Sequence, residues 1–385
     1  MKKVLASILA LVMALGVTTA AWAEGEGATK VAKIGDNEYA TLQEAVNAAT
    51  AGQTIVLQDN VTLTASLNVA VDKTVTLDLN SYKITADMNG PHMICNAGNL
   101  TITDSSENKT GEIAKIGAET NFGYVIENHG TMTLDRCKIS STSVKSSAIE
   151  NGWYTASANT AGTSCTMTIQ NAEVVSVNAA GGLYTVKNDD YGVMVINGGV
   201  FTNGVAGAGA VLNWNDLTIN GGTFTGASAV RTLKSGSSDF ETGKSQIKNG
   251  TFNGGIDTLD GYKTGITIAV TGGTFSTDVT EYLAEGKILQ KNGDTYTAVT
   301  NSGITSGTYT AKPTVPDGYK VVENTDGTFT VEKVGGYYYY QPTTDTKTTD
   351  TKGSPKTFDA GIALYVGMAL TSAAGVAFVG KKRED

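Results

Sequence analysis

One repeat unit of the chain is visible in residues 194–224, which read MVINGGVFTNGVAGAGAVLNWNDLTINGGTF. The motif at 196–201 is an isoleucine, an asparagine, two glycines, a β-branched residue and a phenylalanine, and it returns at 219–224. Two looser copies follow at 247–252 and 270–275, so that the four phenylalanines are 23, 28 and 23 residues apart. Periods in the twenties indicate one supersecondary unit per repeat, stacked on its neighbours.

A second pattern begins further upstream, at residue 94. An apolar residue lies two positions before an asparagine, and a short turn then leads to an alternating apolar strand. The asparagines of this pattern are Asn96, Asn128, Asn151, Asn188 and Asn213. A side-chain amide carries both a donor and an acceptor, and asparagine tolerates the left-handed backbone of a tight turn. We therefore predict that these amides hydrogen-bond along the stack as a structural ladder rather than bind a ligand.

The composition narrows the class of protein. Of 385 residues, 40% are hydrophobic and 17% are charged, with a net charge of −9. These values exclude a disordered chain. The sequence also has no basic patch that could bind nucleic acid against the net negative charge, so we expect no nucleic-acid partner. Short strands broken by glycine and asparagine, rich in threonine, valine and isoleucine, indicate an all-β chain. A leucine-rich repeat has a similar period, but its fixed leucine and asparagine spacing is missing.

A helix signal precedes the first repeats. Thr41 to Glu44 form a capping box that opens a short amphipathic helix through Ala49, and such a helix blocks the open strand edge of a first turn. This opening and the strand at 75–80 resemble the start of pectate-lyase-like β-helix domains in bacterial surface proteins. The resemblance implies a right-handed parallel β-helix solenoid over residues 31–276, with an N-terminal capping helix.

The sequence changes in character after Phe275. Residues 286–297 and 318–330 echo each other, and both predict β-hairpins closed by Asn-Gly or Asp-Gly turns. We therefore predict a duplicated β-hairpin module over residues 277–334 at the C-terminal end of the solenoid. Residues 335–353 are rich in threonine, aspartate and lysine and predict a flexible wall-spanning linker.

Both ends of the chain carry targeting signals. The N-terminus has a basic start, an apolar run and small residues before a cleavage point, as in a secretory signal peptide. We expect cleavage between Ala23 and Glu24, which removes residues 1–23. At the other end, residues 360–380 are uncharged and precede a basic tripeptide, which predicts a transmembrane helix that ends in the cytoplasm.

A short motif stands directly before this span. It consists of Ser354, Pro355, Lys356 and Thr357. Together with the span and the basic tail, residues 354–385 resemble the LPXTG-type sorting signal of Gram-positive wall-anchored proteins, in which a sortase cysteine attacks the threonine carbonyl and passes the chain to peptidoglycan. Phe358 departs from that family, which usually has glycine there. The expected partners are thus sortase and peptidoglycan at the cell surface, with a plain membrane anchor as the alternative.

Two glutamates are the candidates for catalysis. Glu127 and Glu150 each precede a ladder asparagine by one residue, so we expect them on one face, about 4.8 Å apart in adjacent turns. That spacing suits a retaining glycoside hydrolase. The alternative, which we favour, is that both are solvent-facing acids. The pectate-lyase-like resemblance implies lyases with aspartate-bound calcium and an arginine base, yet arginine before the anchor tail is confined to Arg136 and Arg231.

Metal and cofactor sites are not expected. His92 and His129 have no metal or triad partner at a recognisable spacing. The three cysteines, at positions 95, 137 and 165, show no metal pattern either, and we expect them to be small apolar core residues.

Aromatic residues near the turns after the ladder strands favour binding. They are Trp153, Tyr154, Tyr184, Tyr191 and Trp214, with His129 beside them. Sugars stack on exposed aromatic faces while polar neighbours take the hydroxyls. The sequence thus predicts a surface-anchored, adhesin-like protein that binds a glycan or a host surface. A polysaccharide lyase or glycoside hydrolase on the same scaffold, or a passive wall stalk, stays open as an alternative.

Overall fold

The computed structural model describes residues 29–335, except for 118–120, 155, 160, 178–182 and 235–242. The predicted signal peptide, the predicted sorting motif and the predicted transmembrane segment lie outside these residues, as does the predicted linker beyond Gly335. Within the described part of the chain, no helix combines the length and the apolar character needed to cross a membrane.

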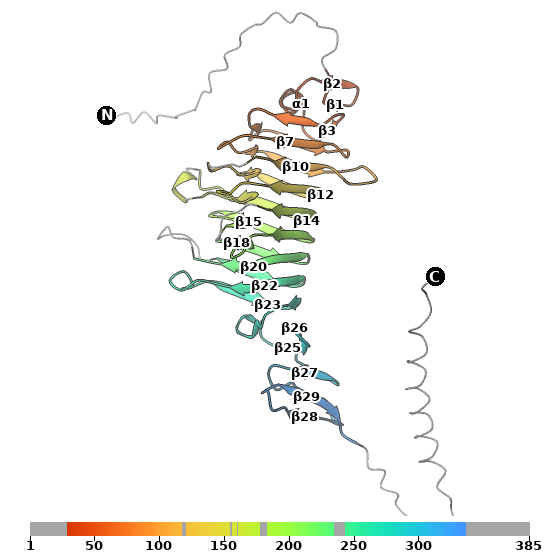
Figure 1. Cartoon of the computed structure of the whole chain (residues 1–385), viewed down its shortest axis with the longest axis vertical. Coiled ribbons are helices and arrows are strands. Elements are labelled where there is room, and N and C mark those ends of the chain that lie inside the picture. The colour runs from red at the N-terminus through yellow and green to blue at the C-terminus, as the bar shows by residue number, and fades with distance from the viewer. Residues whose placement is uncertain are drawn as a thin grey trace, which may run out of the picture. The chain divides into compact units, whose positions relative to one another are not determined.

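The chain is mainly β, and the strands of the repeats pair in parallel in three rows (Figure 1). The ladder row contains β5 (Leu67–Val69), β8 (Ile94–Asn96), β11 (Ile126–Asn128), β13 (Ile149–Asn151), β15 (Tyr184–Asn188), β18 (Gly209–Asn213) and the second halves of β20 (Thr223–Thr232) and β22 (Thr251–Asp257). The second row contains β3 (Gln53–Leu57), β6 (Thr74–Asp78), β9 (Asn99–Thr103), the first halves of β12 (Thr131–Ser141) and β14 (Cys165–Ser176), β16 (Gly192–Ile196), β19 (Asp216–Ile219), β21 (Lys244–Ile247) and β23 (Thr267–Val270).

The third row completes each turn. It contains β4 (Val61–Leu63), β7 (Lys83–Ala86), β10 (Glu112–Lys115), the second halves of β12 and β14, β17 (Gly199–Asn203), the first halves of β20 and β22, and β24 (Thr274–Phe275). Each full turn of chain adds one strand to each row, and successive turns lie against one another. The described repeats therefore form a β-solenoid.

The asparagine ladder is confirmed. Each amide nitrogen donates to the amide oxygen of the next turn, from Asn96 to Asn128 at 2.7 Å and onward through Asn151 and Asn188 to Asn213 at 2.7 to 2.8 Å. These side chains are buried, and each amide nitrogen also donates to backbone carbonyl oxygens of the adjacent turns. The ladder thus satisfies buried polar groups that would otherwise cost about 1 to 3 kcal/mol each.

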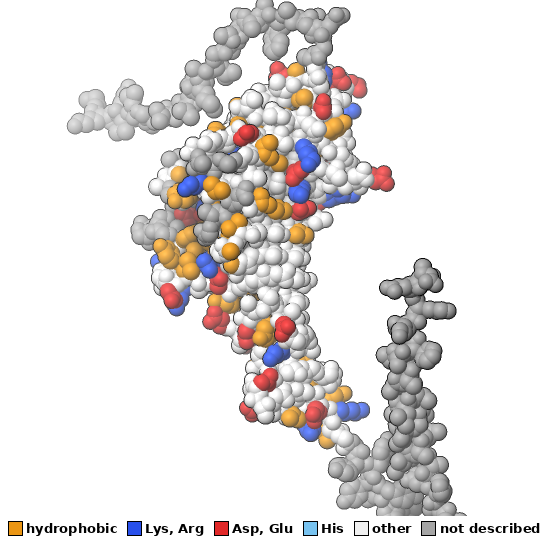
Figure 2. Space-filling view, in the orientation of Figure 1, with side chains coloured by type: hydrophobic (Ala, Val, Ile, Leu, Met, Phe, Trp, Pro, Cys, Tyr) orange, Lys and Arg blue, Asp and Glu red, His pale blue; other side chains and the backbone are white. Residues whose placement is uncertain are grey.

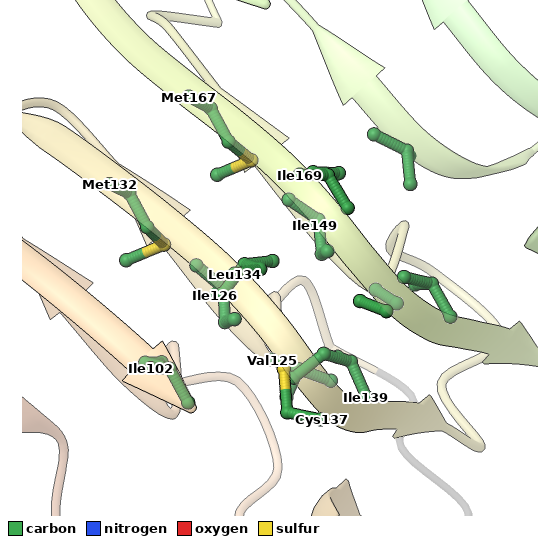
Figure 3. Close-up of a cluster of buried hydrophobic side chains, with 14 of the residues drawn as sticks. Ile102, Val125, Ile126, Met132, Leu134, Cys137, Ile139, Ile149, Met167 and Ile169 are labelled. Carbon is green, nitrogen blue, oxygen red and sulfur yellow. The ribbon is translucent and has the colours of Figure 1, made fainter. Parts of the chain in front are cut away.

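The interior is filled by equivalent apolar side chains at the same place in successive turns. Met132 and Leu134 of β12 face the interior in register with Met167 and Ile169 of β14 (Figure 3). Further along, the motif phenylalanines form a column whose neighbouring ring centroids are 4.9 to 5.0 Å apart, with the rings within 8° of parallel. This repeated burial of apolar surface provides the main stabilisation of the stack.

The N-terminal end is covered as the sequence predicts. The helix α1 (Leu42–Ala48) begins with the capping box of Thr41 and Glu44, and it follows the antiparallel strands β1 (Ala32–Ile34) and β2 (Asn37–Tyr39). Gln43 on α1 accepts from the backbone N–H of Asn68 at 2.8 Å and donates to its carbonyl at 3.0 Å. Because Asn68 lies in β5, the first strand of its row, this side chain takes the place of a missing neighbouring strand.

The C-terminal end changes from parallel to antiparallel pairing. Strand β24 pairs with β26 (Thr295–Thr300), and β26 forms a hairpin with β25 (Lys287–Asn292). A second hairpin, of β28 (Tyr319–Glu323) and β29 (Phe329–Lys333), is joined to the first through β27 (Gly307–Tyr309). Both predicted hairpins are present. The other elements in the described ranges are two short 3-10 helices, η1 (Ala156–Ala158) and η2 (Thr280–Tyr282).

Candidate functional site

The middle residue of each ladder strand faces outward, and these residues form one column across the turns. Its members, each in register with the next, are Asn68, Cys95, Glu127, Glu150, Lys187, Leu212, Arg231 and Asp257. The column arises because the residues on either side, such as Ile126 and Asn128, point inward. It brings five charged side chains and a cysteine from distant parts of the sequence to one face, next to the loops that precede and follow the ladder strands.

Figure 2 shows how side-chain types are distributed over the surface. Apolar side chains gather with charged ones over one side of the stack between β10 and β20, whereas much of the other visible surface of the stack is white, from neutral polar side chains and backbone. A mixed apolar and charged surface of this kind is where ligand recognition is expected.

Glu127 lies half-buried between two histidines. Its Oε1 is 3.3 Å from Nε2 of His92 and 3.9 Å from Nε2 of His129, and its side chain is 19% exposed. Nδ1 of His92 accepts the backbone N–H of Tyr124 at 3.0 Å, so the proton of this imidazole is on Nε2 and points to the carboxylate. Burial raises the pKa of Glu127, and a hydrogen bond with Cys95 only partly opposes this.

His129 is held against an indole ring. Its ring is stacked on Trp153, with the ring centroids 3.7 Å apart and the planes 1° from parallel. Burial, followed by the proximity of His92, lowers the pKa of His129 to about 4. This imidazole is therefore neutral at physiological pH.

Glu150 has a different environment, which corrects the interpretation of both glutamates as solvent-facing acids. Its side chain is only 2% exposed, with Tyr124 and Lys187 against it. Tyr124 donates its hydroxyl to Oε1 at 2.9 Å, and Nζ of Lys187 lies 3.7 Å from the same atom. Burial and a hydrogen bond with Asp189 raise the pKa of Glu150 to about 9 against the opposing charge of Lys187.

The register of the two glutamates is as predicted, since Glu127 pairs with Glu150 in neighbouring strands. Their roles nevertheless differ. Glu127 is accessible at the surface, whereas Glu150 belongs to a buried network with Tyr124, Lys187 and Asp189. This difference leaves one carboxylate, not a pair, in contact with solvent.

Two predicted aromatic residues are linked to Glu127 through other rings, Trp153 through His129 and Tyr154 through Phe122 and His92. Tyr154 is 68% exposed, with Nζ of Lys187 5.1 Å from its ring centroid. Trp153 is half-buried, and its backbone N–H donates to the carbonyl of Asp190 at 2.9 Å, which fixes the loop that carries both rings.

The other predicted aromatics lie elsewhere. Tyr184 is buried against Leu212 and Leu233, with half-buried Trp214 packed on them, so its ring is not an exposed platform. Tyr191 has a φ of 62° and lies in the turn before β16, where its carbonyl accepts the N–H of Cys165. Neither contributes to the surroundings of Glu127 described above.

Sequence reasoning missed two rings of this site. Phe122 is 47% exposed and makes edge contacts with Tyr124 and Tyr154, at 4.8 and 6.0 Å between centroids. Tyr124 is buried and stacked on His92 at 5.1 Å. They precede a ladder strand rather than follow it, and a search on both sides of each strand would have found them.

We name this surface the Glu127 face. It is made of Glu127, His92, His129, Phe122, Trp153 and Tyr154, with Tyr124, Glu150, Lys187 and Asp189 beneath it. Among the residues described in the structure, no three histidine, cysteine or acidic side chains are arranged to hold a metal ion. The three cysteines are free thiols, two of them buried, and burial raises the pKa of Cys95 to about 11. The face thus offers rings, a carboxylate and imidazole groups.

A comparison of the chain with protein families, curated proteins and solved structures finds no match.

Proposed function

We propose that the chain is a surface protein of a Gram-positive bacterium, anchored to the wall through Thr357, that binds glycans or a glycan-bearing host surface with the Glu127 face. The proposed scaffold is a right-handed parallel β-helix similar to pectate-lyase-like domains. The signal peptide, the sorting motif and the apolar segment at 360–380 support the location.

The observation that carries the binding role is the pairing of exposed rings with a half-buried carboxylate. Tyr154 and Phe122 are exposed, and Phe122 makes an edge contact with His92, whose Nε2 is 3.3 Å from Oε1 of Glu127. Sugars combine an apolar face with hydroxyl donors, so rings and a carboxylate acceptor complement them. Many copies on one wall would add weak contacts through multivalency.

Binding is favoured over hydrolysis because of the environment of Glu150. A retaining or inverting mechanism needs two carboxyl groups that both reach the glycosidic bond or its water. Glu150 is enclosed by Tyr124, Lys187 and Asp189, so Glu127 would act without a partner. A glycan that binds this face is therefore expected to dissociate without being cleaved.

The test is glycan binding by the purified protein and its variants. We expect Tyr154→Ala to weaken binding about tenfold, as the loss of one stacking ring worth about 1 kcal/mol or slightly more predicts. Tyr262→Ala is the matched control, because Tyr262 is also an exposed ring but lies outside the Glu127 face. Equal losses in both variants, or new reducing or unsaturated ends that disappear in Glu127→Gln, would contradict the proposal.

A further inference from the structure

Among the residues that the structure describes, no lysine or arginine forms an ion pair with Glu127, whose ion-pair contacts are His92 and His129. His92 carries its proton on Nε2 and accepts at Nδ1, so it is neutral, and His129 stacks on Trp153 in a half-buried place. Cys95, the other contact of the carboxylate, is a neutral thiol. The negative charge of Glu127 is hydrogen-bonded but not balanced.

Two lysines of neighbouring strands are held by other groups. Nζ of Lys187 is 2.5 Å from Oδ2 of Asp189 and 3.7 Å from Oε1 of Glu150. Nζ of Lys115, in the neighbouring β10, donates to the carbonyl of Pro91 and is buried. Both lysines are thus fixed beneath the surface, where Asp189 already compensates Lys187.

The rings around Glu127 suit a cation as well as a sugar. Trp153, Phe122 and Tyr154 are all within the same face, and the last two are well exposed. Aromatic faces attract ammonium groups through their quadrupole, with about 0.5 to 2 kcal/mol per contact. The arrangement under Tyr154 is an internal example, because Nζ of Lys187 already lies 5.1 Å from that ring centroid.

We propose that the Glu127 face selects glycans with free amino groups, of the glucosamine type, over N-acetylated and uronate glycans. The inference rests on the proposed function and adds the class of ligand. The ammonium group would lie at the carboxylate of Glu127, and the sugar rings would stack on Tyr154 and Phe122. A uronate would instead place its carboxylate against that of Glu127, on a chain whose net charge is −9.

The experiment compares three hexasaccharides by calorimetry with the full-length protein: a glucosamine hexamer, its N-acetylated form and an oligogalacturonate. At about pH 6 the sugar amines carry their protons. We expect the glucosamine hexamer to bind about tenfold or more tightly than the N-acetylated form, as one charge-assisted contact predicts. Glu127→Gln should remove that preference, so that the glucosamine hexamer and its N-acetylated form bind the variant with affinities within about twofold of each other.

Glu173→Gln is the matched control. It removes the same charge from a half-exposed position in the third-row part of β14, where Glu173 pairs with Lys138, and it should keep the preference. Equal or tighter binding of the N-acetylated or uronate hexamer would overturn the amine selectivity and leave the proposed function standing. If none of the three hexamers binds, both proposals are refuted. An equal loss in both glutamine variants would show a long-range charge effect and overturn the role of Glu127.

Discussion

Replacement of Glu150 by glutamine tests the electrostatics beneath the Glu127 face. Tyr124 donates to one oxygen of Glu150 at 2.9 Å, and the other side of the carboxyl meets Asp189. With its pKa raised to about 9 by burial and by Asp189, Glu150 keeps its proton at neutral pH and shares it with Asp189. A glutamine copies this arrangement, because its oxygen accepts from Tyr124 and its nitrogen donates to Asp189.

The magnitude follows from proton linkage. The unfolded chain releases the proton of Glu150 near pH 4.5, whereas the folded chain holds it until about pH 9. When the pKa of a group is higher in the folded chain than in the unfolded chain, its full contribution to the free energy of unfolding is present below the unfolded-state pKa. That contribution falls by about 1.4 kcal/mol per pH unit as the pH rises from the unfolded-state pKa to the folded-state pKa. Between pH 4.5 and pH 7 the free energy of unfolding of the wild type therefore falls by about 3 kcal/mol through this group, whereas that of Glu150→Gln does not.

The assay is urea unfolding of the purified wild type and Glu150→Gln between about pH 5 and pH 8. We expect the variant to be at least as stable as the wild type near pH 5. The difference in free energy of unfolding should then grow in favour of the variant as the pH rises. Glu150→Ala should instead lose about 2 to 4 kcal/mol, since it leaves Tyr124 and Asp189 without this partner. Glu173→Gln, at the surface, should follow the wild-type profile. Parallel profiles for the wild type and Glu150→Gln would mean that Glu150 is ionised and would refute the argument.

Three further predictions concern the ladder, a turn and the anchor. Asn151→Leu should lower the free energy of unfolding by about 1 to 3 kcal/mol, whereas Asn197→Leu, with an exposed amide, should cost less than about 0.5 kcal/mol; equal costs in urea unfolding would count against the ladder. The carboxylate of buried Asp104 accepts the backbone N–H groups of Ser81, Ser106 and Gly111. Burial opposes its ionisation, but a hydrogen bond with the Ser106 side chain and these backbone bonds outweigh burial and lower its pKa below 3.8. The stabilisation by Asp104 is therefore present above about pH 4 and is lost in more acid solution. Asp104→Asn should be less stable than the wild type at neutral pH, and a stability difference that does not narrow in acid would contradict this. Finally, muramidase should release the protein from washed cell walls, and release by detergent alone would leave only the membrane anchor.

The solenoid was predictable from sequence because its stabilising contacts repeat. A hydrogen-bonded ladder needs an amide at every turn, and a column of stacked rings needs a phenylalanine at every turn, so the residues recur at the period of the chain. Asn188 and Phe224 are recognisable for this reason. The register of Glu127 with Glu150 followed from the same periodicity.

The burial of Glu150 was not predictable in the same way. It depends on Tyr124, which precedes one ladder strand, and on Asp189, which follows another, and the connecting segments differ in length from turn to turn. The pairing of Glu127 with His92 likewise joins a ladder strand to a loop outside the repeat pattern. Side chains in such loops meet only through the folded path of the chain, so periodicity carries no information about them.

The asparagine ladder also has a direction. Every amide from Asn96 to Asn213 donates toward the C-terminal end, and the last one donates to the hydroxyl of Ser245, which is itself bonded to Thr232. The amide dipoles therefore add along the axis, as peptide dipoles do in an α-helix, and each bond polarises the next. The solenoid interior thus contains a row of aligned amide dipoles. This row ends at the hydroxyl of Ser245, which accepts the hydrogen bond of the last amide inside the core.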